Sequence, residues 1–136
     1  MGRTKPPPTW DGNLTVLVCR DSDCGSSRKH PDVDHTGQME ALEEAVQQAG
    51  GARLLVPRCL DACSHSNVVV VRHRGPAGSV TTWFEQVLSR KRTRALCDWL
   101  AAGGPREAVP LPPTLAAAVF TPTRESAAQA AREEPS

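Results

Sequence analysis

Apolar residues along the chain occur either in short β-branched runs or at helical spacing, which predicts strands and helices in turn. Residues 13–20 form an apolar run of strand length, and residues 67–72 contain four consecutive valines, a pattern typical of a strand buried on both faces. Shorter runs predict two more strands at residues 53–56 and 80–84. The last two strands in chain order are expected to form a hairpin around the turn at residues 75–78.

Two segments show the helical period instead. Residues 36–49 are expected to form a helix that ends at Gly50-Gly51, because glycine commonly follows a last helical turn. Residues 89–102 are expected to form a second helix, with Ser89 as its N-cap. The apolar residues that define the inward faces are Met39, Leu42, Val46 and Ala49 in the first helix and Leu96, Trp99 and Leu100 in the second.

The order β-α-β-β-β-α predicts an α/β domain, a small mixed sheet with two flanking helices, over residues 13–104. A strand, helix and strand in one sheet need a right-handed crossover, so the strands at residues 13–20 and 53–56 are expected to be parallel. Residues 1–12 are Pro-rich and polar and are expected to be a disordered leader. Residues 105–136, rich in Pro, Ala and charged residues, are expected to be a mostly disordered tail.

Composition and motifs argue against several classes of function. The 136 residues carry a formal net charge of +1 and 4% aromatic residues, which argues against a nucleic-acid partner. The sequence has neither a signal-peptide apolar region nor an apolar run of the roughly 20 residues that span a bilayer. We therefore expect a cytoplasmic protein without membrane insertion. It has no Gly-rich phosphate loop, nucleophile elbow or Cys-x-x-Cys motif, so no enzyme activity is expected.

Four of the five cysteines form two pairs, and each pair follows a predicted strand. Cys19 and Cys24 give a C-x4-C spacing, and Cys59 and Cys63 give C-x3-C. Open α/β sheets bind ligands at the carboxyl ends of their parallel strands, so the two pairs are expected to meet at one edge of the sheet. In a reducing cytoplasm, paired cysteines are more often metal ligands or redox catalysts than structural disulfides.

Several metal groups are compatible with four thiolates, which select zinc, copper(I) or iron–sulfur clusters. Tetrahedral zinc sites commonly use tight C-x2-C spacings. The wider spacings here suit a larger group whose two irons each take two sulfurs, although the plant-type and bacterial two-cluster ferredoxin patterns are both absent from the sequence. A zinc-binding structural or regulatory module of the same fold is the alternative. A redox enzyme or sensor whose cysteines form disulfides is the third hypothesis.

The segments around both pairs resemble a known family. Residues 16–19 with Cys24, residues 58–63 and the valine-rich residues 67–71 are similar to the thioredoxin-like 2Fe-2S ferredoxins and to the related small subunit of NADH dehydrogenases and NAD-linked hydrogenases. The resemblance covers residues 13–103 and implies a thioredoxin-like fold without a catalytic site. It also implies one 2Fe-2S cluster, with one pair of cysteines on each iron, held by Cys19, Cys24, Cys59 and Cys63.

Such a protein passes single electrons between partner redox proteins, as a free carrier, as a homodimer or as a subunit of a larger redox complex. Basic residues beside the cysteines favour an acidic partner and would raise the reduction potential of an anionic cluster. These residues are Arg20, Arg28, Lys29 and Arg58.

Other residues are given ordinary structural roles. Cys97 lies on the second predicted helix and is expected to pack as a small hydrophobe in the core. Trp83 and Trp99 are expected to pack in the core or at its edge. His30 and His35 are expected to be solvated loop residues, because four cysteines already satisfy two irons.

Overall fold

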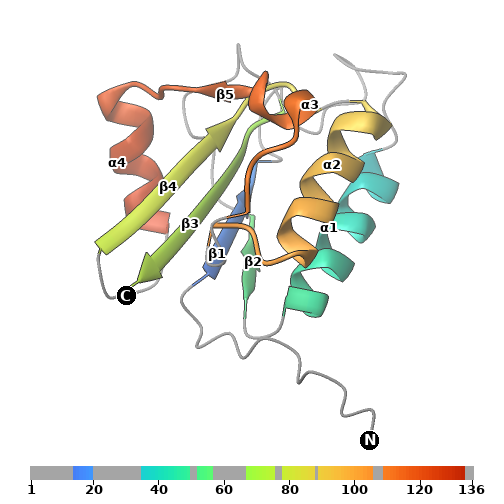
Figure 1. Ribbon diagram of the computed structural model, residues 1–136. Helices are drawn as coiled ribbons and strands as arrows, with labels where there is room; N and C mark the ends of the chain where they lie inside the picture. The colour runs from blue at the N-terminus through green and yellow to red at the C-terminus, as the bar shows by residue number, and fades with distance from the viewer. Residues whose placement is uncertain are drawn as a thin grey trace, which may run out of the picture.

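The computed structural model of the protein describes residues 14–19, 35–49, 52–56, 67–75, 78–87, 89–105 and 109–133. Within these residues there are five strands and four helices (Figure 1). The strands are β1 (Leu14–Val18), β2 (Arg53–Leu55), β3 (Val69–Gly75), β4 (Gly78–Phe84) and β5 (Val119–Phe120). The helices are α1 (His35–Ala49), α2 (Arg90–Ala101), α3 (Pro113–Ala116) and α4 (Arg124–Glu133).

The five strands form one mixed sheet in the order β2-β1-β3-β4-β5. β1 and β2 are parallel, whereas β3 is antiparallel to β1, β4 to β3, and β5 to β4. The α/β class, the parallel first pair and the β3–β4 hairpin are therefore confirmed. This arrangement is compatible with a small thioredoxin-like fold.

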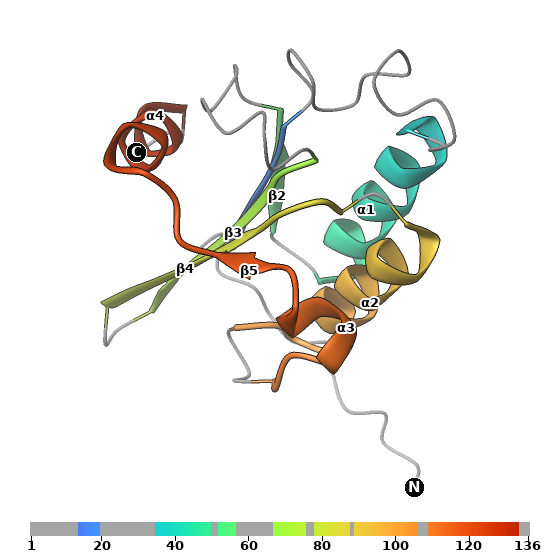
Figure 2. The same cartoon turned by 90° about the horizontal axis from the view of Figure 1, so that it is seen from above.

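α1 and α2 lie side by side against one face of the sheet, and α4 lies against the other face (Figure 2). The valines at the start of β3 show why both faces are buried. Val69 and Val71 contact the core beneath α1 and α2, whereas Val68 and Val70 belong to a second apolar cluster beneath α4. A strand buried on both faces is thus confirmed where four valines follow one another.

Trp83 and Trp99 pack as expected, one in each apolar cluster. Trp99 of α2 is 5% exposed and meets Phe84 edge-to-face, with ring centroids 5.9 Å apart. Trp83 is 4% exposed on the other face and contacts Phe120 in the same T-shaped geometry at 5.9 Å. The Trp99 Nε1 also donates to the Val109 carbonyl at 2.8 Å, so the polar end of this side chain is satisfied.

The limits of α2 follow from capping chemistry. The Ser89 side chain accepts a hydrogen bond from the Arg92 backbone N–H at 3.0 Å, which confirms Ser89 as the N-cap. At the other end, Gly103 and Gly104 adopt φ angles of 119° and 51°, in the region that glycine enters most readily. No helix within the described residues has the length and apolar character needed to cross a bilayer.

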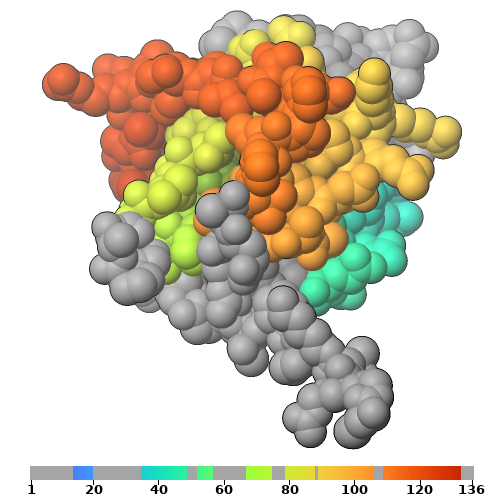
Figure 3. Space-filling model, viewed as in Figure 1, coloured from blue at the N-terminus to red at the C-terminus, as the bar shows by residue number. Residues whose placement is uncertain are grey.

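The expectation of a mostly disordered chain after residue 105 is wrong for residues 109–133, which contain α3, β5 and α4. A few apolar side chains attach this region to the existing core. Leu115 and Ala118 are completely buried, and β5 pairs with the free edge of β4. The Thr123 hydroxyl accepts the Ser126 backbone N–H at 3.1 Å and so caps the start of α4. Ala130 of α4 is also buried, in the second apolar cluster, so the region is held in place by the surface that it covers. In the space-filling view it runs across the front of the molecule (Figure 3).

Candidate functional site

Three chain segments meet at one edge of the sheet, the edge where the cysteine pairs were expected. The register of β1 and β2 pairs Leu17 with Leu55, so these two parallel strands end side by side. Val18 pairs with Val69 of the antiparallel β3, which therefore begins where β1 ends. In Figure 1 this is the upper end of the molecule, where α1 and α2 also begin. We call this end of the sheet, where β1 and β2 end and β3 begins, the β1 edge, although β1 itself is an inner strand.

Cys19 follows β1 directly at this edge. Its backbone N–H donates to the Val68 carbonyl at 3.0 Å, which extends the β1–β3 pairing by one further hydrogen bond. The residue is 2% exposed and belongs to the apolar cluster formed by Leu17, Val68, Val70 and Trp83. Cys19 is thus held rigidly, in surroundings of low dielectric.

The other three predicted ligands lie outside the described residues. Cys24 falls in residues 20–34, between β1 and α1. Cys59 and Cys63 fall in residues 57–66, between β2 and β3. The flanking basic residues that favoured an acidic partner also lie outside the described residues, and these are Arg20, Arg28, Lys29 and Arg58.

The described strand ends nevertheless fix where these segments begin and end. β2 and β3 are the two neighbours of β1 in the sheet, so the chain from Leu55 to Asn67 connects strands on opposite sides of Cys19. Neighbouring strands lie roughly 4.8 Å apart. A chain extends by at most about 3.6 Å per residue, so four residues beyond a strand end span no more than about 14 Å. Cys59 is four residues beyond Leu55, and Cys63 is four residues before Asn67.

A buried polar network, which the sequence analysis missed, supports the same edge. Asn67 is 0% exposed, Gln38 of α1 is 7% exposed and Thr93 of α2 is 8% exposed. The Gln38 Nε2 donates to the Val87 carbonyl and to Thr93 Oγ1, the latter at 3.1 Å. The Gln38 Oε1 accepts from Asn67 Nδ2 at 3.4 Å, and the Asn67 carbonyl accepts the Val87 N–H at 3.0 Å. One amide side chain thus connects α1, α2 and the residue that lies two positions before β3.

His35 is also part of this arrangement. It is the first residue of α1 and not a loop residue as expected, and its Nδ1 lies 3.3 Å from Asn67 Nδ2. His35 ends the segment that carries Cys24, and Asn67 ends the segment that carries Cys59 and Cys63. The contact between them therefore fixes the ends of both cysteine-bearing segments relative to each other.

The sequence contained one signal for the network. Gln38 lies four residues before Leu42 and eight before Val46, so it occupies the apolar stripe of α1. A polar residue on such a stripe needs a hydrogen-bonding partner in the core. Its partners, Asn67 and Thr93, come from other elements, so the sequence could indicate the position but not the contacts.

Cys97 packs at the edge of the core, where it contacts the main apolar cluster between α1 and α2. Cys97 packs against the core as expected, although its side chain is only partly buried. It lines an open groove of about 650 Å³ between the two helices. Burial raises the pKa of the Cys97 thiol to about 11, and the nearby carboxylates of Asp98 and Glu44 act in the same direction. The thiol is therefore protonated at neutral pH.

The sequence was compared with models of known protein families and with curated proteins, and neither comparison gives a match.

Proposed function

We propose that the protein is a one-electron carrier that holds a single 2Fe-2S cluster through Cys19, Cys24, Cys59 and Cys63. The cluster takes up and releases one electron when bound, and partner redox proteins supply and accept it. A cytoplasmic location and the absence of enzyme activity belong to the same proposal.

The arrangement of β2, β1 and β3 is the observation that carries this proposal. Cys19 directly follows the middle strand of the three, and the segment with the second cysteine pair connects the two flanking strands. Chain connectivity would allow Cys59 and Cys63 to reach Cys19, which supports the proposal. A connection between more distant strands would not have done so.

The environment of Cys19 also suits a thiolate ligand of a cluster. The residue is shielded from water, which protects a cluster from hydrolysis, and its backbone is fixed by the hydrogen bond to Val68. Burial is costly for an unpaired thiolate, but a metal ion removes that cost because it carries the compensating positive charge. A soft, apolar, four-thiolate donor set fits an iron–sulfur cluster.

Single cysteine variants test the ligand set. Cys19→Ala is expected to lose or damage the cluster, because a three-thiolate site leaves one iron open to water. Cys97→Ala is the matched control, since it removes a cysteine outside the β1 edge, and it should keep the cluster at a stability cost on the order of 1 kcal/mol. The measurement is the visible absorption and iron content of protein purified anaerobically. Loss of the cluster in Cys97→Ala together with its retention in Cys19→Ala would contradict the proposed ligands.

A further inference from the structure

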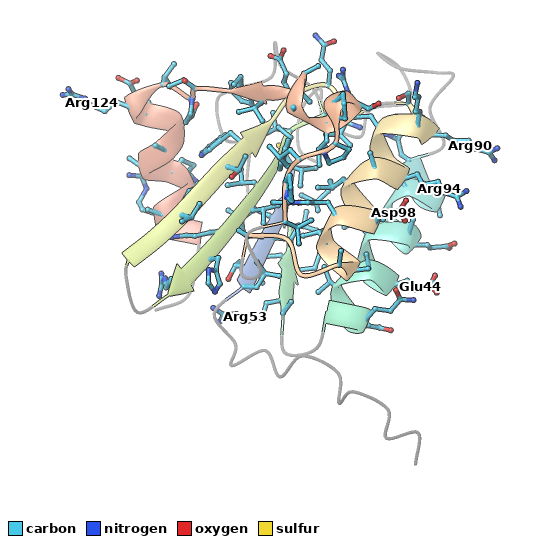
Figure 4. All side chains as sticks on the ribbon, viewed as in Figure 1. Glu44, Arg53, Arg90, Arg94, Asp98 and Arg124 are labelled. Carbon is cyan, nitrogen blue, oxygen red and sulfur yellow. The ribbon has the colours of Figure 1, made fainter. Side chains whose placement is uncertain are left out.

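The first two turns of α2 carry an exposed group of positive charges. Arg90, Lys91 and Arg94 are all exposed, and the first turn contains no acidic residue. Within the part of the chain that the structure describes, none of these three side chains makes an ion pair or hydrogen bond. Figure 4 shows Arg90 and Arg94 projecting outward from the same side of the helix. We call these three residues the basic surface of α2.

Arg92, between them, has a different role. Its side chain is partly buried, and its Nη1 donates to the Gln86 carbonyl at 3.1 Å, where Gln86 has a positive φ of 47°. Arg92 therefore stabilises the turn that enters α2 and is not part of the basic surface.

Arg90 and Lys91 in the first turn do not stabilise the helix, whereas Arg94 has the opposite charge of Asp98 four residues after it. Cations near a helix N-terminus face the positive end of the macrodipole. Arg94 also follows Lys91 by three residues and Arg90 by four, and like charges at these spacings repel each other. α4 differs in that its first turn contains an acidic residue, Glu125, beside Arg124, and its last turn contains Arg132. Helix stability therefore does not account for the positive charges in the first turn of α2.

The basic surface is fixed relative to Cys19 by the buried polar network. Thr93 lies between Lys91 and Arg94, and its hydroxyl accepts a hydrogen bond from Gln38. Gln38 accepts from Asn67, whose neighbour Val68 accepts the backbone N–H of Cys19. A short series of hydrogen bonds thus connects the start of α2 to the β1 edge, and a partner seated on the basic surface would lie beside that edge.

We propose that the basic surface of α2 is a docking surface for an acidic protein. Its role in electron exchange rests on the proposed 2Fe-2S function. An exposed group of positive charges attracts an anionic surface and accelerates encounter with it at low salt. Long exposed side chains suit such a transient contact, because surface charges steer association more than they add affinity.

The binding test uses a fluorescein-labelled peptide of twelve glutamates as the probe and fluorescence anisotropy at low salt as the readout. The wild-type protein is expected to bind, and Arg90→Glu/Arg94→Glu is expected to weaken binding about tenfold. Arg124→Glu/Arg132→Glu is the matched control, because it changes the net charge equally on α4, and it should weaken binding less than about twofold. Equal weakening by both double variants, or no binding by the wild type, would overturn the proposal.

The redox test compares two inorganic oxidants of the reduced protein, anionic ferricyanide and cationic hexaammineruthenium(III). The variant at Arg90 and Arg94 should react about tenfold more slowly with ferricyanide and faster with hexaammineruthenium, and both effects should shrink at high salt. Equal rates for the two double variants would reject the role of α2 in electron exchange. If the protein held no cluster, the proposed function would fail, while the peptide titration would still decide whether α2 binds acidic surfaces.

Discussion

The buried amide of Gln38 provides a sharp test of the packing around the β1 edge. Gln38→Ala removes the groups that bond the Val87 carbonyl, the Thr93 hydroxyl and the Asn67 amide. Asn67 is 0% exposed, so its freed N–H cannot turn to water without a local rearrangement. A buried donor or acceptor left without a partner costs about 1–3 kcal/mol.

The Val87 carbonyl, the Thr93 hydroxyl and the Asn67 amide each lose one hydrogen bond, and local rearrangement recovers part of the lost energy. We therefore expect Gln38→Ala to lower the free energy of unfolding by about 3 kcal/mol. For a domain of this size that corresponds to a fall in Tm of roughly 10 °C. Urea unfolding followed by circular dichroism measures the change, with the cofactor state held the same in every variant because bound groups shift apparent stability.

Gln48→Ala is the matched control, with the same residue type on the same helix. Gln48 is exposed, and within the described residues its side chain makes one long hydrogen bond, to Glu44 at 3.5 Å. Its replacement should change stability by less than about 0.5 kcal/mol, since alanine also favours the helix. If the two variants were equally stable, the network would not stabilise the fold and the reasoning about the β1 edge would be refuted.

Three further predictions concern other parts of the molecule. Leu115→Ala should cost about 3 kcal/mol because the side chain is completely buried, whereas Val119→Ala, at 44% exposed, should cost far less; equal losses in urea unfolding would mean that α3 does not pack on the core. Cys97 has a raised pKa of about 11, so stability should fall between pH 9 and 11, where the unfolded thiol ionises first; Cys97→Ala should remove that fall, and an unchanged pH profile would contradict the assignment. Arg90→Glu/Lys91→Glu should raise the free energy of unfolding by roughly 0.5–1 kcal/mol, because the substitutions reverse the unfavourable interaction with the helix dipole; a loss of stability in thermal melts would count against it.

Local sequence patterns predict the strands and helices up to residue 104 because each carries its own periodic signal. The valine run identifies β3, and apolar residues three to four apart identify α1 and α2. The parallel pairing of β1 and β2 follows from chain order and crossover geometry. These features depend on short stretches of sequence, so they can be predicted without knowledge of the tertiary contacts.

The later part of the chain could not be predicted in the same way. Leu115 and Ala118 lie in a short apolar run, residues 115–120, inside a Pro- and Ala-rich segment, and they become core residues only because α2 and β4 provide a surface for them. The network of Gln38, Asn67 and Thr93 likewise depends on three elements far apart in sequence. In both cases the stabilising contact is tertiary, and a periodic pattern carries no signal for it.

The cysteine pairs are an intermediate case. Their spacing and their position after strands predicted both a common edge and a thiolate site, and the strand order supports the common edge. The ligand role of Cys24, Cys59 and Cys63 stays a prediction, since these residues lie outside the described part of the chain.

Iron, zinc and acid-labile sulfide determined on the anaerobically purified protein test the central claim most directly. Four thiolates that bind two sulfide-bridged irons predict about two irons and two sulfides per chain, with a red-brown colour. One zinc per chain without sulfide would instead establish the zinc module. A metal-free protein with fewer titratable thiols than its five cysteines would indicate disulfides, and either result would contradict the account.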